Sequence, residues 1–185
     1  MLDKLSGLLE RKAFLVKVDE ELKRSVRYRR PFGFLMIDLA HNHFSQDRDV
    51  RWSMGYSLLK QLAAVLKLGL RDVDVLGRFD GEVFGAALPE TDVAGALVAA
   101  ERVRKTVADH WFMGTTQEDR VRVAVNVGFV TFPEHGDTLQ SLVDAAKGAL
   151  EQAKTEGGNK VIEGQRVAAE EAAPEKAPEP APEPE

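Results

Sequence analysis

The stretch DVLGRFDGEVFGAALPET, residues 74–91, decides the fold of this chain. Two short runs with strand character, residues 74–79 and 83–88, flank the polar triplet Asp80-Gly81-Glu82. An Asp-Gly pair between such runs is a strong hairpin signal, because a type I′ turn needs positive φ at both of its central positions. The stretch therefore predicts two antiparallel strands joined by a tight turn.

Upstream of the hairpin, the pattern predicts a helix, a strand and a second helix. Residues 8–29 carry apolar side chains at four-residue spacing, which is typical of one helical stripe, and Pro31 ends this helix. Residues 32–37 form a continuous apolar run that predicts a buried strand ending at Asp38. The stripe consists of Phe14, Val18, Leu22 and Val26, and the second helix directs Leu59, Leu62, Leu66 and Leu70 inward.

Downstream of the hairpin, two more helices and two strands are expected. Thr91 or Asp92 caps a third helix. Residues 121–127 alternate strictly, which predicts a strand. A last helix over residues 139–154 ends at Gly157-Gly158, and residues 161–162 add an edge strand. The third helix is expected to bury Val93, Ala96, Leu97, Ala100 and Val103.

The order of these elements predicts an α+β domain over residues 1–162. Helix, strand, helix, hairpin, helix, strand and helix match the split βαβ, ferredoxin-like arrangement, with a mostly antiparallel central sheet flanked by helices. Residues 163–185 are rich in Pro, Glu and Ala and contain no apolar side chain larger than valine. Such a segment cannot bury enough surface to offset its ordering entropy, so we expect a disordered acidic tail.

Charge excludes one class of function. The formal net charge is −5, and the seven acidic and two basic side chains of residues 163–185 account for all of it. The body is therefore neutral and lacks the basic face that nucleic-acid binding requires. The chain has no cysteine. It also has neither a long apolar run nor a leader-like segment, so we expect a cytoplasmic protein without a membrane span.

Several ordered matches connect the chain to a known family. Arg78-Phe79 precedes the turn Asp80-Gly81-Glu82-Val83-Phe84, and Leu88-Pro89-Glu90-Thr91 follows it. Further matches are Asp3-x-Leu5-Ser6-Gly7-Leu8, Arg11-Lys12-x-Phe14, Asn126-Val127-Gly128, and Ala153-Lys154 with Gly157 and Asn159. Over roughly residues 1–162 the chain resembles the GGDEF, or diguanylate cyclase-like, domains. The resemblance implies their palm-like fold.

The resemblance also implies which residues would hold GTP and its metal. Asp38 and Glu82 match two magnesium-binding carboxylates, and the main-chain carbonyl of Leu39 matches a further ligand. Lys154 matches a phosphate contact. These residues leave room for a residual magnesium site, although Asp38 and Glu82 are equally well explained as inherited acids without an ion.

The remainder of the catalytic site departs from the family pattern. Asp80 replaces a glycine, Val83 replaces the second acid of the turn, and Tyr56 replaces an aspartate that binds guanine. Ala40 and Gly158 replace a further aspartate and an arginine. Each lost transition-state contact typically costs ~10²–10³ in rate. We therefore expect no cyclase activity and no required cofactor.

The pattern Arg71-x-x-Asp74 lies just before the hairpin, where the family has its inhibitory product site. Arg102 matches an additional arginine of that site. An arginine fork can bind the O6/N7 edge of guanine, and a carboxylate can accept from its N1–H and N2 groups. The resemblance thus implies cyclic di-GMP as ligand. The alternative is a local ion pair between Arg71 and Asp74 without any ligand.

Taken together, the motifs favour a catalytically inactive GGDEF domain that binds cyclic di-GMP at Arg71, Asp74 and Arg102 and passes the signal to an unidentified protein partner. A ligand-linked dimer is compatible with the resemblance. One alternative is a protein-interaction scaffold whose nucleotide sites are all vestigial. Another is an allosteric module that still binds GTP at Asp38, Glu82 and Lys154. Neither nucleic acid nor a membrane is an expected partner.

Overall fold

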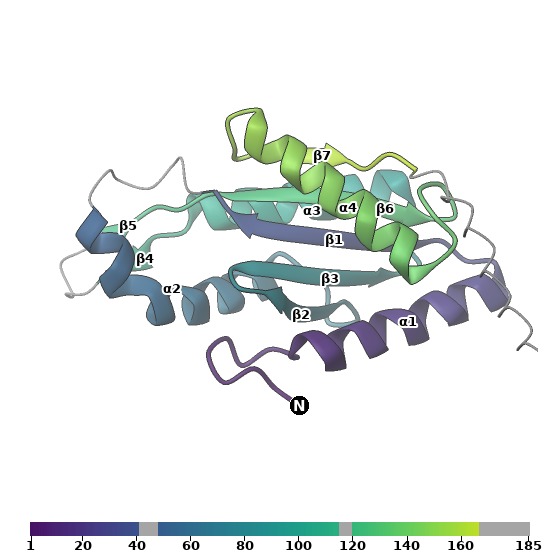
Figure 1. The fold of residues 1–185 in the computed structure, drawn as a ribbon, viewed down its shortest axis with the longest axis horizontal. Coiled ribbons are helices and arrows are strands. Elements are labelled where there is room, and N and C mark those ends of the chain that lie inside the picture. Colours follow the sequence, from purple (N-terminus) through teal and green to yellow (C-terminus); the bar gives the residue numbers. More distant parts are fainter. Residues whose placement is uncertain (41–47, 115–119, 167–185) are drawn as a thin grey trace, which may run out of the picture.

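The computed structural model describes residues 1–40, 48–114 and 120–166, with the backbone alone for 48–56. Four long helices accompany a five-stranded sheet of order β2-β3-β1-β6-β7 (Figure 1). All neighbours in this sheet are antiparallel except β6 and β7. The elements are α1 (Arg11–Tyr28), β1 (Phe32–Leu39), α2 (Arg48–Leu68), β2 (Val75–Asp80), β3 (Val83–Pro89), α3 (Val93–Asp109), β4 (Phe112–Met113), β5 (Arg120–Val121), β6 (Val125–Phe132), α4 (Leu139–Thr155) and β7 (Val161–Glu163).

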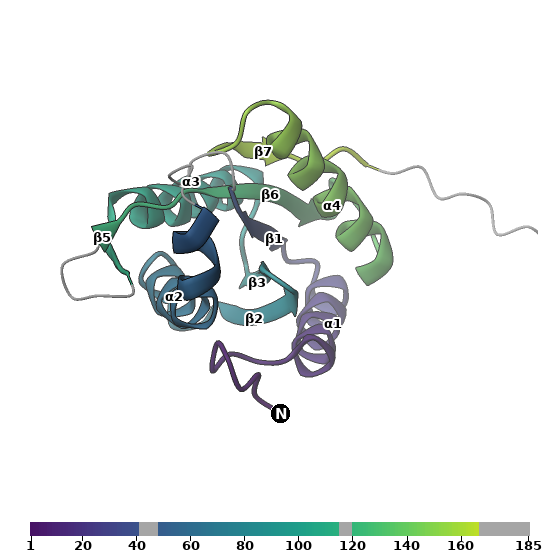
Figure 2. The same cartoon turned by 60° about the vertical axis from the view of Figure 1, so that its left-hand side comes forward.

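Helices cover both faces of the sheet, as Figure 2 shows. Strand β1 lies in the middle and is buried along its whole length, so its side chains alternate between two cores. Leu35, Ile37 and Leu39 pack in the core that α2 and α3 cover. Phe34 and Met36 pack in the opposite core, beneath α1 and α4. The predicted α+β architecture, a ferredoxin-like sheet flanked by helices, is confirmed.

Two glycines of the hairpin make room for α1. Gly77 of β2 and Gly85 of β3 face each other across the strands. A Cβ atom at either position would lie 2.4 Å from the ring of Phe14, which is fully buried. The glycines therefore let an aromatic ring of α1 lie directly on the backbone of the hairpin.

The hairpin is confirmed, but its turn differs from the predicted type I′. Strand β2 continues through Asp80, so the loop consists of Gly81 and Glu82. Only Gly81 has a positive φ, of 43°. The pairing register also shifts between Arg78 and Asp80. This irregularity places Asp80 opposite Val83, which closes the turn one residue later than the Asp-Gly pattern indicates.

Two predicted core positions are wrong. Val26 is 47% exposed and Leu97 is 44% exposed. A strict four-residue spacing drifts around a helix that has about 3.6 residues per turn, so α1 buries Ser25 in place of Val26. Helix α3 buries Ala96, Ala99, Ala100, Val103 and Val107, a stripe that excludes Leu97.

The predicted strand at residues 121–127 is two separate strands. Its first residue ends β5, which pairs with β4 in a separate two-stranded sheet. The chain then enters β6 at Val125 and continues to Phe132. Strand β6 lies between β1 and β7 and is buried almost throughout, so strict alternation could not have identified it.

The folded part extends past the predicted boundary at residue 162. Glu163 ends β7, and the amide of Gly164 donates to the Phe129 carbonyl at 2.8 Å. Arg166 forms an ion pair with Asp137. Residues 167–185, the remainder of the predicted tail, lie outside the described residues. Among the helices that the structure describes, none is both long and apolar enough to cross a membrane.

Candidate functional site: a polar pocket beside the hairpin

Arg71 and Asp74 occupy a short turn between α2 and β2. The Asp74 amide donates to the Arg71 carbonyl at 3.0 Å. In return, the Arg71 amide donates to Asp74 Oδ2 at 2.7 Å. The other carboxylate oxygen, Asp74 Oδ1, is buried and has no hydrogen-bond partner among the described residues. A buried carboxylate oxygen without a donor is unfavourable, so the turn holds an acceptor ready for an external donor.

The environment of Asp74 shifts its acidity. Burial raises the pKa of Asp74 above its usual 3.8. The Arg71 amide and the charges of Arg71 and Arg102 pull the pKa in the opposite direction, but they do not cancel the effect of burial. The ionised carboxylate is therefore under-stabilised in the ligand-free domain.

Arg102 reaches this region from α3. Its Nε donates to the Gly69 carbonyl at 2.7 Å, at the end of α2. A side chain on Gly69 would meet the Cα of Val103 at 2.9 Å, so glycine allows the two helices to approach closely there. The structure thus brings Arg71, Asp74 and Arg102 to one region, as the sequence predicted. Their role as ligand contacts stays a prediction.

A cavity of about 310 Å³ adjoins this turn. The described residues that line it come from the N-terminal loop on one side and from the end of α2 and the start of β2 on the other. Arg102 does not belong to this lining. The lining residues are Leu2, Gly7, Leu8, Leu9, Lys67, Leu70, Arg71, Asp72, Asp74 and Leu76.

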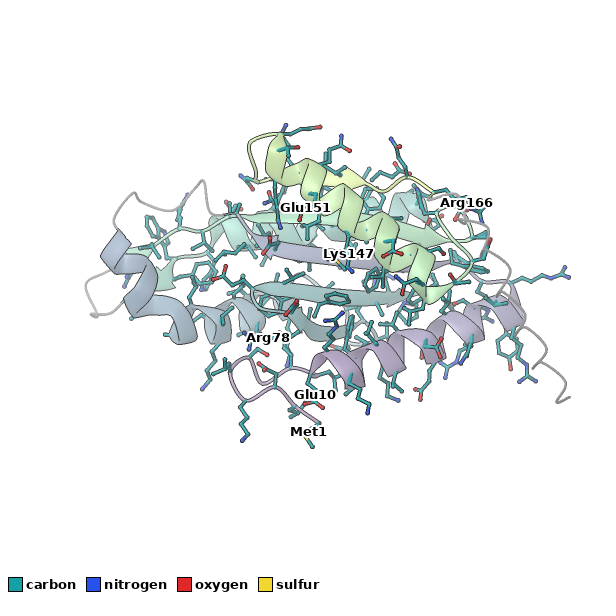
Figure 3. The ribbon with its side chains drawn as sticks, in the orientation of Figure 1. Met1, Glu10, Arg78, Lys147, Glu151 and Arg166 are labelled. Atoms are coloured by element: carbon teal, nitrogen blue, oxygen red, sulfur yellow. The ribbon has the colours of Figure 1, made fainter. Side chains whose placement is uncertain are left out.

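A second feature, which the sequence did not predict, connects the N-terminal loop to the hairpin through Arg78. Its NH1 group forms a salt bridge with Asp3 at 3.0 Å, and its Nε donates to the Gly81 carbonyl at 2.8 Å. Figure 3 shows Arg78 between the N-terminal loop and the hairpin. Burial acts to raise the pKa of Asp3, but hydrogen bonds from Ser6 and Arg78 outweigh it and lower the pKa.

The position that the resemblance assigns to catalysis contains an internal ion pair. Asp38 is buried at the end of β1, opposite Val83 on one side and Asn126 on the other. Lys154 Nζ of α4 lies 2.7 Å from Asp38 and 2.9 Å from Glu151. Burial acts to lower the pKa of Lys154, but its hydrogen bonds to Asp38 and Glu151 outweigh this and raise the pKa. The ammonium is therefore shared between two carboxylates, one of which the resemblance assigned to magnesium.

The residues opposite Asp38 in the sheet, Val83 and Asn126, add no negative charge. Among the described residues no group of three or more His, Cys, Asp or Glu side chains could hold a metal. Val83, at the position of the second acid, packs against the core beneath α1 and α4. The amide oxygen of Asn126 is buried without a partner among these residues, but it adds no negative charge. The side chain of Tyr56 lies outside the described residues.

A ferredoxin-like sheet with helices on both faces, and with polar sites flanking a glycine-containing hairpin, defines the palm-like class of domains. The family model described as "Diguanylate cyclase, GGDEF domain" matches residues 1–160. The chain belongs to the GGDEF family. It is 30% identical over 161 residues to the response regulator PleD of Caulobacter vibrioides, which covers 86% of this chain but only 35% of PleD. The chain thus spans about a third of that relative.

Solved structures show the same fold. The GGDEF domain of YfiN from Pseudomonas aeruginosa superposes with a TM-score of 0.80 at 22% identity, covering 89% of this chain and 95% of that domain. The diguanylate cyclase SiaD of the same organism, solved with its activator SiaC, gives 0.76 at 28% identity, covering 88% and 61%. The GGDEF domain of DgcB from Caulobacter crescentus, solved with cyclic di-GMP, gives 0.75 at 20% identity, covering 88% and 92%.

Proposed function

We propose that this chain is a catalytically inactive GGDEF domain that acts as a cyclic di-GMP receptor through Arg71, Asp74 and Arg102. The observation that carries the proposal is the buried, unpaired Oδ1 of Asp74 beside a cavity that Arg71 also lines. Guanine offers two adjacent donors, N1–H and N2–H, that a carboxylate can accept, while an arginine fork matches its O6/N7 edge. The ligand thus supplies the donors that the ligand-free site lacks.

Loss of catalysis rests on the residues around Asp38. Val83 and Ala40 stand where the family has acids, so Asp38 and Glu82 are the carboxylates that remain of the family's set there. Asp80 introduces a carboxylate at a position where the family has a glycine, and it would repel a triphosphate. Joining two GTP molecules requires cations that bridge phosphate oxygens, and this side-chain set does not assemble them. The receptor would then signal by presenting a ligand-bound surface to a protein partner.

Calorimetry with cyclic di-GMP tests the receptor function. We expect micromolar or tighter affinity, about −8 kcal/mol. Arg71→Ala should weaken binding by roughly 10- to 100-fold, because it removes a bidentate, charge-assisted contact. Arg120→Ala is the matched control, since Arg120 is exposed on β5 and far along the chain from the pocket. An absence of heat with the parent protein at high micromolar concentration would favour the interaction scaffold instead.

The same protein incubated with GTP and magnesium should form no cyclic di-GMP. Chromatographic detection of product above a buffer blank would show that the chain is an enzyme. Binding of GTP that Lys154→Ala abolishes, without binding of cyclic di-GMP, would favour the GTP-responsive module. These three titrations separate the receptor from both alternatives.

A further inference from the structure

The cavity beside Asp74 continues beyond the arginine and the carboxylate that recognise guanine in the proposed receptor. Its lining includes Leu2 and Leu9 of the N-terminal loop and Leu70 after α2, together with the buried Leu8 and Leu76. An apolar wall of this kind suits the flat face of a purine or the carbons of a ribose. A nucleotide that reaches Asp74 therefore has a surface for its less polar parts.

The charged residues that line this cavity include one further cation, Lys67. Lys67 and Arg71 line it together with Asp72 and Asp74, so the lining has no net charge. A cyclic dinucleotide carries two phosphodiester charges. If Arg71 binds the edge of guanine, Lys67 is the remaining cation in the cavity lining that can face a phosphate. Without Lys67 the lining would be negative and would repel the ligand.

Lys67 is available for such a contact. It lies in the last turn of α2 and is exposed. No hydrogen bond, ion pair or ring contact connects its side chain to any other described residue. Two other cations near the polar sites are already bound, since Arg78 pairs with Asp3 and Lys154 pairs with Asp38. The ammonium of Lys67 can therefore reorient toward a ligand without breaking an internal contact.

We infer that the ligand site extends into this cavity, with Lys67 binding a phosphate of the cyclic dinucleotide and the leucines of the N-terminal loop covering its base or ribose. The inference rests on the proposed receptor function and deepens it. An ammonium suits this role because it acts as a point charge on a flexible stem, whereas the planar arginine fork suits the base edge. Base recognition and phosphate binding are thus divided between two neighbouring residues.

The test compares Lys67→Ala with Lys60→Ala, which removes an exposed lysine of the same helix outside the cavity. Calorimetry with cyclic di-GMP is run at low and at high salt. We expect Lys67→Ala to weaken binding by roughly 5- to 30-fold at low salt, as for the loss of one charge-assisted hydrogen bond. It should also make the affinity less dependent on salt. Lys67→Arg should retain most of the affinity, and Lys60→Ala all of it.

A second readout separates phosphate binding from base recognition. The adenine analogue shares the phosphates of the ligand, so Lys67→Ala should weaken both dinucleotides by the same factor. Asp74→Asn should instead change the ratio of their affinities. If the parent binds cyclic di-GMP but Lys67→Ala behaves like Lys60→Ala at both salt concentrations, the extension of the site is wrong while the receptor function stands. If the parent does not bind at all, both proposals fail.

Discussion

At the scale of single residues, the ion pair between Lys154 and Asp38 shows how this domain holds a buried carboxylate. A buried carboxylate is stable only if it is paired or coordinates a metal. Here Asp38 is buried and Lys154 is 35% exposed at its side chain. The lysine supplies the counter-charge and also contacts Glu151 at 2.9 Å. The pair is therefore a structural contact between β1 and α4.

Removing the lysine should therefore destabilise the fold. We expect Lys154→Met to lower the free energy of unfolding by about 1–3 kcal/mol, less than for a fully buried pair because Lys154 is partly exposed. The double variant Asp38→Asn, Lys154→Met should recover much of this loss, since no buried charge then remains. Urea denaturation of the parent, both single variants and the double variant measures the effect. Equal stability of Lys154→Met and the parent would show that the pair contributes nothing.

Asp74 presents the opposite case, a carboxylate whose ionisation lowers the stability of the folded domain. Because the pKa of Asp74 is raised in the folded protein, the protonated form of Asp74 stabilises the fold relative to the unfolded chain. This contribution is fully present below pH 3.8, the pKa of the unfolded chain, and it is lost as the pH rises through the pKa of the folded protein. Near neutral pH, Asp74→Asn should thus make the ligand-free domain slightly more stable, and this gain should vanish in acid. Urea denaturation between pH 3 and 7 measures it. A variant less stable than the parent at pH 7 would contradict the expected sign.

At the scale of elements, the hairpin depends on the close contact between α1 and its glycine pair. We expect Gly85→Ala to lower the free energy of unfolding by about 1–3 kcal/mol, because the added methyl group would collide with a Phe14 ring that has no free space. Gly148→Ala is the matched control: nothing lies within 4 Å of its Cβ position on the exposed face of α4. That change should stabilise the helix by ~0.5–1 kcal/mol. If both variants lose stability equally, the packing argument fails.

The sequence predicted the helices and strands better than it predicted the contacts between distant side chains. Turn residues, apolar runs and helical periods depend on local preferences, so the hairpin, the four helices and β1 were predictable. The break before Val125 was not, because a strand buried on both faces loses its alternation. The pairing of Asp38 with Lys154 joins residues far apart in the chain, and nothing in their local sequence indicates which partner each will find. The same holds for Asp3 and Arg78.

At the scale of the whole molecule, the candidate ligand cavity and the hairpin turn share one framework. Leu9 lines the cavity, and its carbonyl accepts from the Arg78 amide at 2.8 Å. The side chain of Arg78 in turn binds Asp3 and the Gly81 carbonyl. A ligand that packs against the N-terminal loop would therefore stabilise contacts that extend to the turn, and its effect should be measurable as stability of the entire domain.

The last prediction uses this linkage. A ligand that binds only the folded state at 100 times its dissociation constant adds about 2.7 kcal/mol to the free energy of unfolding. For a domain of this size that corresponds to roughly 5–10 °C in Tm. Cyclic di-GMP should therefore raise the Tm of the parent by several degrees, and that of Arg71→Ala much less at the same concentration. GTP with magnesium should leave both unchanged, because the proposed receptor binds its nucleotide at Asp74 and not at Asp38. A shift with GTP that matches the shift with cyclic di-GMP would place the binding site at Asp38 and argue against the pocket at Asp74.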